Sequence, residues 1–253
     1  MIDPTRPNAG RIPRMPSKPH YPQPVFEPGP TPELSPGRHT NPDLTELVII
    51  LDASTSMRGV KGEVIAGFNE LIDDQKNQPG DCNVTLVQFS STKSQRTLLD
   101  CVPIQSVPPL SVANYCTQGL TALLDAIGST VDSLGRRLSD TPQAERPNKV
   151  IIAIMTDGDE NDSREYTATL VKQKVEHQRD VYQWEFVFTA ANQDAVLAAR
   201  TYGLDTDLAA TYQDSMEGTR SSFKGMSAGV SQLRCGNKMA AVAAVKHIEK
   251  DSK

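Results

Sequence analysis

Three short segments of the sequence carry oxygen-bearing side chains at spacings that suit a divalent cation. The first is DASTS, in which a carboxylate and two hydroxyls alternate at Asp52, Ser54 and Ser56. The other two are GLTALLDAI, which contains Thr121, and MTDGDEN, which contains Asp157. Magnesium prefers octahedral oxygen ligation, keeps several waters and rarely uses more than one or two protein carboxylates. The sequence therefore predicts a metal site formed by Asp52, Ser54, Ser56, Thr121 and Asp157.

The predicted donors favour Mg²⁺, with Mn²⁺ or Ca²⁺ as alternatives, and suit zinc or copper poorly because no nitrogen or sulfur ligand is present. Each segment also has a plainer interpretation, since serines and threonines cap helices and Asp157-Gly158 is a common turn pair. The prediction depends on all three segments occurring in order at strand ends or helix starts. The acidic residues 159–162 are interpreted as a solvated rim, with Asn161 or Ser163 capping the next helix.

The elements that must position these side chains alternate between strands and helices. Apolar runs at residues 47–51 and 149–155 predict buried strands, each ending just before an aspartate. Further strands are expected at 83–89, at 97–102 as a hairpin return, and at 184–189. Helices are expected at 60–76, 120–138, 163–178, 193–202, 215–234 and 240–248. Such alternation indicates an α/β fold with a mostly parallel sheet, which binds ligands at the carboxyl ends of its strands.

Residues 1–46 differ in composition from the rest, because they hold twelve of the 18 prolines. Proline excludes helix, and too few apolar residues are present to form a core. We predict three parts: an extended Pro-rich arm over 1–44, a folded domain over 45–236 and a C-terminal helical tail over 237–253. The arm is interpreted as a linker or tail, or as a segment that lies along a neighbouring subunit and mediates self-association.

Charge and cysteine usage exclude several classes of protein. The net charge is -5, and residues 1–46 contribute none of it, because their five basic and five acidic residues cancel. An acidic body argues against nucleic acid as the ligand. No apolar run is long enough to span a membrane and no signal peptide is visible, so a cytoplasmic protein is expected. The four cysteines lack C-x-x-C spacing and are expected to be reduced thiols, although a disulfide between two of them stays open.

These motifs resemble the metal-ion-dependent adhesion site of von Willebrand factor type A domains: D-x-S-x-S, a later Thr before a helix, and a later T-D-G after a strand. The resemblance runs from about Thr45 to about Arg234. Within the family, the sequence resembles the intracellular branch that is found in bacteria and their phages. The segments that carry this resemblance include GFNELIDDQK, GDCNVTLVQF and RPNKVIIAIMTDGDEN.

The resemblance implies a doubly wound, mostly parallel sheet with one antiparallel edge strand and helices on both faces. It also implies that Ser54, Ser56 and Thr121 bind the metal directly, whereas Asp52 and Asp157 act largely through bound waters. One metal position would then be open to an acidic side chain of a partner. Leu120 departs from the family, which often has a small residue before the threonine, and this bulk alters access without removing a ligand.

The leading hypothesis is a metal-dependent protein-binding module that is not an enzyme. The alternative is a structural or assembly subunit, for example of a phage particle, whose arm runs over a neighbour; its location would then be the virion. A metal-dependent hydrolase is disfavoured, because the sequence has no Walker motif, no G-x-S-x-G and no H-x-x-x-H. In addition, the position two after Asp52 is Ser54 and not a second acid.

Overall fold

The structure is a computed structural model that describes residues 41–191 and 194–251. The predicted Pro-rich arm therefore lies outside the described residues, apart from residues 41–44. These four residues begin the first strand, so regular structure starts earlier than the apolar run at 47–51 suggested. Asn41 is tied to the domain, since its backbone N–H donates to the carbonyl of Arg146 at 2.9 Å.

A six-stranded sheet forms the centre of the described part, in the order β3-β2-β1-β4-β5-β6. All neighbouring strands pair in parallel except β2 and β3, which are antiparallel. This confirms the predicted fold class, including the antiparallel edge strand at the hairpin return. The strands are β1 (Asn41–Asp52), β2 (Asp81–Phe89), β3 (Arg96–Pro103), β4 (Pro147–Thr156), β5 (Glu185–Ala191) and β6 (Ala209–Tyr212).

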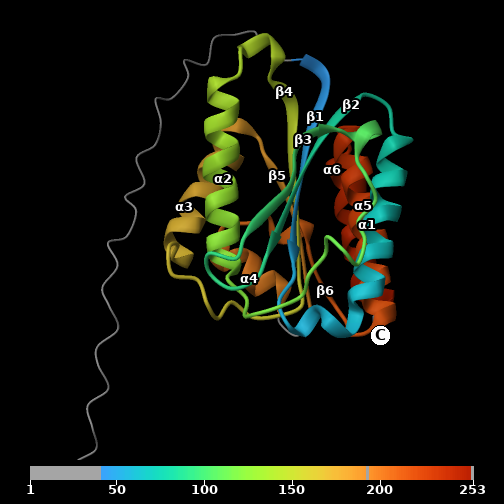
Figure 1. Ribbon diagram of the computed structural model, residues 1–253. Coiled ribbons are helices and arrows are strands. Elements are labelled where there is room, and N and C mark those ends of the chain that lie inside the picture. Colours follow the sequence, from blue (N-terminus) through green and yellow to red (C-terminus); the bar gives the residue numbers. More distant parts are fainter. Residues whose placement is uncertain (1–40, 192–193, 252–253) are drawn as a thin grey trace, which may run out of the picture.

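Helices cover both faces of the sheet (Figure 1). On one face lie α1 (Lys61–Lys76), α5 (Met216–Arg234) and α6 (Lys238–Asp251), and on the other lie α2 (Leu123–Asp140), α3 (Ala168–Tyr182) and α4 (Ala195–Tyr202). Short 3-10 turns occur at Ser56–Val60, Ile104–Ser106, Gln143–Glu145 and Thr206–Leu208. Because the chain turns from β1 toward β2 and later from β4 toward β5, the strand order reverses between β1 and β4. Open α/β sheets bind ligands at such a point.

Strand β1 shows how the sequence creates two cores. Leu47, Ile49 and Leu51 face the α1/α5/α6 layer, whereas Val48 and Ile50 face the α2/α3/α4 layer, and all five are fully buried. Side chains of a strand alternate between the two faces, so a continuous apolar run is what a strand buried on both sides requires.

Three expectations about element boundaries need correction. Strand β6 was not anticipated, because its four residues, AATY, are too few to show a periodic pattern. The expected helix at 163–178 begins only at Ala168, where Thr167 is the N-cap and accepts a hydrogen bond from the backbone of Leu170. The expected helix at 120–138 begins at Leu123, so Thr121 precedes the helix instead of starting it.

The C-terminal helix α6 packs against α5 and contributes to the first core. Ala241, Val245 and Ile248 are buried there. Glycines on α5 permit this close approach: a Cβ at Gly225 would collide with the side chain of Ile248. The predicted division at 44/45 and 236/237 stays a prediction, but α6 shares its core with the helices before it.

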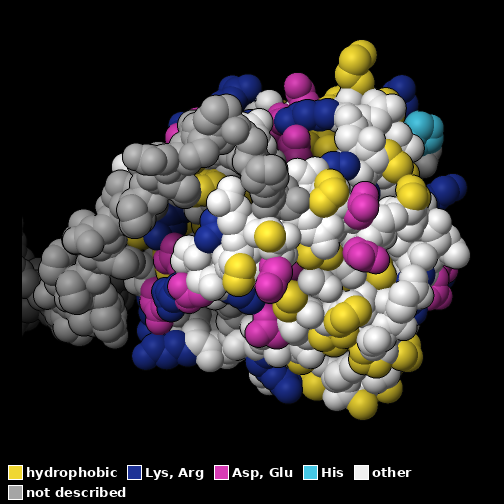
Figure 2. Space-filling model, turned by 90° about the horizontal axis from the view of Figure 1, so that it is seen from above, with side chains coloured by type: hydrophobic (Ala, Val, Ile, Leu, Met, Phe, Trp, Pro, Cys, Tyr) yellow, Lys and Arg dark blue, Asp and Glu magenta, His cyan; other side chains and the backbone are white. Residues whose placement is uncertain are grey.

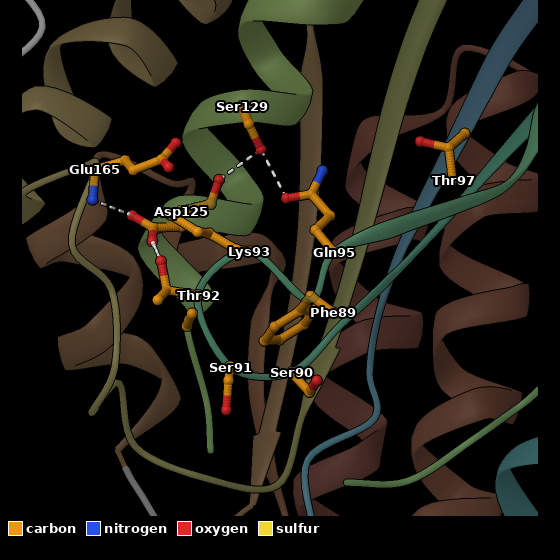
Figure 3. A pocket seen from close by; sticks show the side chains of 11 residues that line it. Phe89, Ser90, Ser91, Thr92, Lys93, Gln95, Thr97, Asp125, Ser129 and Glu165 are labelled. Carbon is orange, nitrogen blue, oxygen red and sulfur yellow. Dashed lines mark hydrogen bonds between the residues drawn. The ribbon is translucent and has the colours of Figure 1, made fainter. Parts of the chain in front are cut away.

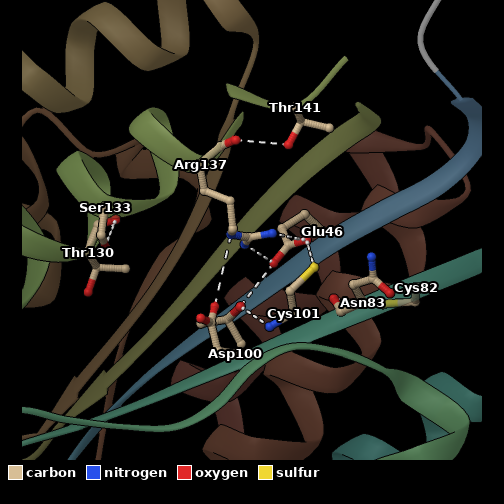
Figure 4. A network of polar contacts seen from close by, with 10 residues as sticks. Glu46, Cys82, Asn83, Asp100, Cys101, Thr130, Ser133, Arg137 and Thr141 are labelled. Carbon is tan, nitrogen blue, oxygen red and sulfur yellow. Dashed lines mark hydrogen bonds and ion pairs between the residues drawn. The ribbon is translucent and has the colours of Figure 1, made fainter. Parts of the chain in front are cut away.

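A buried carboxylate ties β1 to α2 at the amino end of the sheet (Figure 4). Glu46 is 1% exposed and receives hydrogen bonds from the Arg137 guanidinium at 2.6 Å and from the Thr85 hydroxyl at 3.0 Å. The Cys101 thiol lies 3.8 Å from its second oxygen. Such a charge is tolerated in a core only when it is paired and hydrogen-bonded.

Two further features describe the surface and the thiols. Seen from the amino ends of the strands, Lys/Arg and Asp/Glu side chains lie among one another and do not form one basic patch (Figure 2). Within residues 41–191 and 194–251, no helix combines the length and apolar character needed to cross a membrane.

All four cysteines carry free thiols.

We expect Arg137→Met to lower the free energy of unfolding by about 2–3 kcal/mol, because the Glu46 carboxylate would stay buried without its charged partner. Urea denaturation of the purified protein measures this. Arg136→Met, on the neighbouring exposed side chain, is the matched control and should change little. Equal stabilities of the two variants would contradict the assigned role of the ion pair.

Candidate metal site

Asp52 is the last residue of β1, and its carboxylate is fully buried between the two central strands. One carboxylate oxygen accepts the backbone N–H of Ser54 at 2.7 Å. The other accepts the hydroxyl of Thr156, the last residue of β4, at 2.6 Å. The parallel pairing of Leu51 with Met155 places Asp52 and Thr156 side by side. The carboxylate is thereby fixed in orientation by the strand on either side of the switch point.

A chain of hydroxyls links the DASTS loop to Asp157. The Ser54 and Ser56 hydroxyl oxygens are 2.9 Å apart, and Ser56 donates to the Asp157 carboxylate at 2.7 Å. Ser54 and Asp157 are each 2% exposed, whereas Ser56 is exposed. The cluster is therefore buried on its sheet side and open to solvent at Ser56.

Thr121 completes the cluster from a third loop. Its hydroxyl lies beside Gly158, where an added Cβ would stand 3.2 Å from the Thr121 Oγ1 and 4.0 Å from the Ser56 Oγ. The glycine thus leaves a space between these two oxygens that any other residue would begin to fill. All five predicted donors come together at the carboxyl end of the sheet, although their role as metal ligands stays a prediction.

Backbone hydrogen bonds hold the Thr121 loop against its neighbours. The carbonyl oxygen of Gly119 accepts two hydrogen bonds from Thr55, one from its backbone N–H at 3.1 Å and one from its hydroxyl at 2.9 Å. The backbone N–H of Leu120 donates to the Ser91 hydroxyl at 2.9 Å. Gly119 has φ of +72°, and a Cβ there would collide with Ser91. Glycine is required where the left-handed conformation and a close contact coincide.

The acidic loop after Asp157 is exposed at Asp159 and Asn161, as expected of a solvated rim, but it also forms hydrogen bonds that the sequence did not suggest. The Asn161 side chain accepts the backbone N–H of Thr121 at 2.9 Å, and the Thr121 carbonyl accepts the backbone N–H groups of Asn161 and Asp162 at 3.0 and 3.2 Å. Glu160 accepts the N–H of Leu124 at 2.9 Å in the first turn of α2. These side chains hold the start of α2, and neither Asn161 nor Ser163 caps α3.

Asp125 fixes the other end of the same loop. Its carboxylate accepts backbone N–H groups from Arg164, Glu165 and Tyr166 at 3.0, 2.9 and 2.8 Å, and the Thr92 hydroxyl at 2.7 Å. Sequence analysis did not single out Asp125, because one aspartate in the first turn of a helix carries no specific signal. Here it joins α2 to the loop that carries Asp157.

Two tyrosines and one aspartate near the cluster were also missed. Tyr115 and Tyr212 donate their hydroxyls to the backbone carbonyls of Asp52 and Thr156 at 2.5 and 3.0 Å. Asp214 follows β6 and acts electrostatically on Asp157. Asp214 lies two residues after β6, whereas Asp52 ends β1 and Asp157 directly follows β4, so all three lie near the carboxyl ends of their strands. Recognition of β6 would therefore have drawn attention to Asp214.

The electrostatics of the cluster favour a cation. Burial, opposed in part by the hydrogen bonds from Thr156 and Ser54, raises the pKa of Asp52 from its ordinary value of 3.8 to about 6. Burial raises the pKa of Asp157 as well, and the negative charge of Asp214 adds to that effect. Two carboxylates that are costly to ionise together become easier to ionise when a positive charge lies between them.

A cavity of about 180 Å³ lies next to the cluster, between the loop that follows β2 and the start of α2 (Figure 3). None of the five predicted donors lines it. Ser90 and Ser91 do, and the same residues hold the Thr121 loop, because the Ser90 carbonyl accepts the N–H of Ala122 at 2.8 Å. The cavity is thus a neighbour of the site and not part of it.

The comparisons with known proteins agree with the von Willebrand factor type A fold that the sequence predicted. The family model for that domain matches residues 46–195, and the chain belongs to this family of protein-interaction modules. A search of curated proteins gave no match.

Solved structures share the fold at low sequence identity. A pilus adhesin, SpaC, from Lactobacillus rhamnosus GG matches with a TM-score of 0.53 and 14% identity, over 76% of this chain and 30% of its own. Proximal thread matrix protein 1 from the mussel byssus gives 0.51 and 13%, over 77% and 47%. A von Willebrand factor type A protein from Catenulispora acidiphila gives 0.50 and 17%, over 75% and 43%. The chain spans less than half the length of each.

We expect Asp52→Asn to stabilise the protein in EDTA at pH 7.5. The folded state binds a proton on Asp52 between about pH 6 and pH 3.8, where the unfolded chain does not, so the contribution of Asp52 to wild-type stability rises as pH falls through this window. The ionised form therefore costs up to about 3 kcal/mol above pH 6, because one pKa unit corresponds to about 1.4 kcal/mol.

Urea denaturation of both proteins from pH 8 to pH 4 measures this effect. The advantage of Asp52→Asn should shrink toward pH 4, and Asp140→Asn, at the exposed end of α2, should give no such pH-dependent difference. A constant difference between wild type and Asp52→Asn across this range would contradict the raised pKa.

Proposed function

We propose that this domain binds a divalent cation and, through it, a carboxylate of a protein partner. Mg²⁺ is the proposed ion, with Mn²⁺ and Ca²⁺ as alternatives. Ser54, Ser56 and Thr121 would supply hydroxyl ligands, and Asp52 and Asp157 would act largely through bound waters. The observation that carries the proposal is the hydroxyl–carboxylate cluster, in which Ser56 contacts both Ser54 and Asp157 and is open to solvent.

The donor chemistry fits a hard cation. Every side-chain atom in the cluster that could bind a metal is an oxygen, which suits magnesium and disfavours zinc or copper. Gly158 leaves free the space between the Thr121 and Ser56 oxygens. In the part of the chain that the structure describes, no group of three or more His, Cys, Asp or Glu side chains is placed to hold a metal. Of the five proposed donors, only Asp52 and Asp157 are carboxylates, and the other three are neutral hydroxyls.

The predominance of neutral hydroxyls among the proposed donors supports a role in partner binding. An ion held mainly by neutral hydroxyls keeps most of its positive charge, so it attracts a further carboxylate from outside the domain. Ser56 is where solvent, and hence a partner, can reach the site. The rigid loops around Thr121 support the same role, because a site held by backbone hydrogen bonds is organised before the partner arrives.

Isothermal titration with MgCl₂ tests the metal site. We expect Asp52→Asn, Asp157→Asn and Thr121→Val each to weaken binding by more than about tenfold, which corresponds to about 1.4 kcal/mol. Asp140→Asn and Ser139→Ala, on the exposed end of α2, are matched controls and should bind as wild type does.

Wild-type protein without measurable Mg²⁺ or Mn²⁺ binding would overturn the metal site. In an affinity-capture experiment on lysate of the native host, the immobilised protein should bind its partner in MgCl₂ and release it in EDTA. Capture that is equal in both would move the partner surface away from the cluster.

We propose a binding role and not catalysis, because the carboxylates of the cluster already accept hydrogen bonds that fix them: Asp52 from Thr156 and Ser54, and Asp157 from Ser56. Turnover of a panel of phosphoesters in Mg²⁺ that disappeared in Asp52→Asn would replace this proposal with a metal-dependent hydrolase.

A further inference from the structure

The face that carries the metal-site cluster has an unusual share of exposed apolar side chains. Five large apolar residues are exposed in the described part of the chain, and four lie at the carboxyl end of the sheet, where the cluster also lies: Val112, Leu120, Leu197 and Met216. The fifth, Met239, opens α6 at the opposite end of the sheet. We call the four residues the apolar rim.

Two members of the rim lie in the loop that precedes α2, and two lie in the first turns of α4 and α5. Leu120 precedes Thr121 and is 53% exposed, and Met216 opens α5 two residues after Asp214. Leu197 lies in the first turn of α4, and the carbonyl of Val112 accepts a hydrogen bond from Lys61, the first residue of α1. A partner that offers its carboxylate to the metal would therefore also meet apolar side chains.

The chain contains a segment with that chemistry. Residues 24–36 read PVFEPGPTPELSP, in which Glu27 follows Phe26 and Glu33 precedes Leu34. Between residues 21 and 37 these two glutamates are the only charged residues, because no Asp, Lys, Arg or His occurs there. Such a segment offers what the site and its rim would bind: a carboxylate next to a large apolar side chain.

Chain length decides whether the segment can reach its own site. Glu33 is eight residues before Asn41, and eight residues span at most about 29 Å. Strand β1 runs from Asn41 to Asp52, eleven steps or about 36 Å at 3.3 Å per residue. Glu33 therefore cannot reach the cluster of its own chain.

Glu27 is fourteen residues from Asn41, which allows at most about 50 Å. Strand β1 lies inside the sheet, with helices on both faces. A chain that connects Asn41 to the cluster from outside must therefore also pass around a helix about 10 Å in diameter, once on the way out and once on the way back. That adds about 20 Å to the 36 Å of the strand. A second copy of the chain is then the geometrically favoured acceptor for both glutamates.

We propose that the metal site of one copy binds residues 24–36 of another copy, with Glu27 or Glu33 at the metal and the adjacent Phe26 or Leu34 on the apolar rim. This inference rests on the proposed function. The contact is head-to-tail, since the arm leaves at the amino end of the sheet and the site lies at the carboxyl end. Head-to-tail contacts produce rings or open chains of subunits instead of a closed symmetric dimer.

The negative charges of Asp157 and Asp214 predict that this contact depends on the cation. Without a metal, a glutamate would approach a cluster that already carries like charge, which costs binding free energy. With the metal, the same charges hold the ion to which the glutamate binds. Self-association should therefore be lost in EDTA as well as on removal of the two glutamates.

Sedimentation velocity of the full chain is the first part of the test. Wild-type protein should form species larger than a monomer in MgCl₂ and sediment as a monomer in EDTA. A Glu27→Gln/Glu33→Gln double variant should be monomeric in both, and Asp3→Asn, which changes another acid of the arm, should behave as wild type does. Association of wild type that persists in EDTA, or association of the double variant, would overturn the inference.

In the second part, a fluorescent peptide of residues 22–37 is titrated with the full-length double variant. The arm of this variant lacks both glutamates and should therefore not compete with the peptide. We expect Mg²⁺-dependent binding that is weakened more than about tenfold by Glu→Gln changes in the peptide, and weakened by Leu120→Ser with Mg²⁺ affinity unchanged. Normal Mg²⁺ binding with no peptide binding would reject this inference and leave the proposed function intact. Absence of Mg²⁺ binding would reject both.

Discussion

The burial of two carboxylates where the central strands end is the constraint on which the rest of the site depends. Asp52 is fully enclosed by β1 and β4, and desolvation raises its pKa to about 6. A buried carboxylate is tolerated only when its oxygens are hydrogen-bonded. Thr156 and the backbone of Ser54 supply those bonds, and Ser56 does the same for Asp157. These hydrogen bonds offset part of the cost of burial, and a cation at the cluster would offset more of it.

Hydrogen bonds from the surrounding loops fix the positions of the other residues of the cluster. Asn161 and Glu160 bind backbone groups of Thr121 and Leu124, and Asp125 binds three successive N–H groups of the segment that follows. Acidic side chains at the start of a helix also interact favourably with its dipole. The residues that looked like a solvated rim therefore hold one proposed ligand, Thr121, at a fixed distance from another, Asp157.

The sequence was most informative where periodicity and side-chain chemistry agreed. The apolar run of β1 and the aspartate after it predicted both a buried strand and a donor at its carboxyl end, and the fold confirms the strand. Strand β6 was missed because its four residues, AATY, are too few to show a periodic pattern, and Asp214 was missed with it. The roles of Asn161 and Asp125 were not predictable, since they bind backbone groups about 40 residues away.

The most direct test of the account is a crystal structure of the protein with Mn²⁺, located by its anomalous scattering. We expect one ion with the hydroxyls of Ser54, Ser56 and Thr121 as direct ligands at about 2.2 Å, as is usual for hard cations of this size. The carboxylates of Asp52 and Asp157 should lie one water further away, and the exposed position should hold water or a carboxylate from another molecule. An ion bound directly by both aspartates, or bound instead in the loop of residues 159–162, would contradict it.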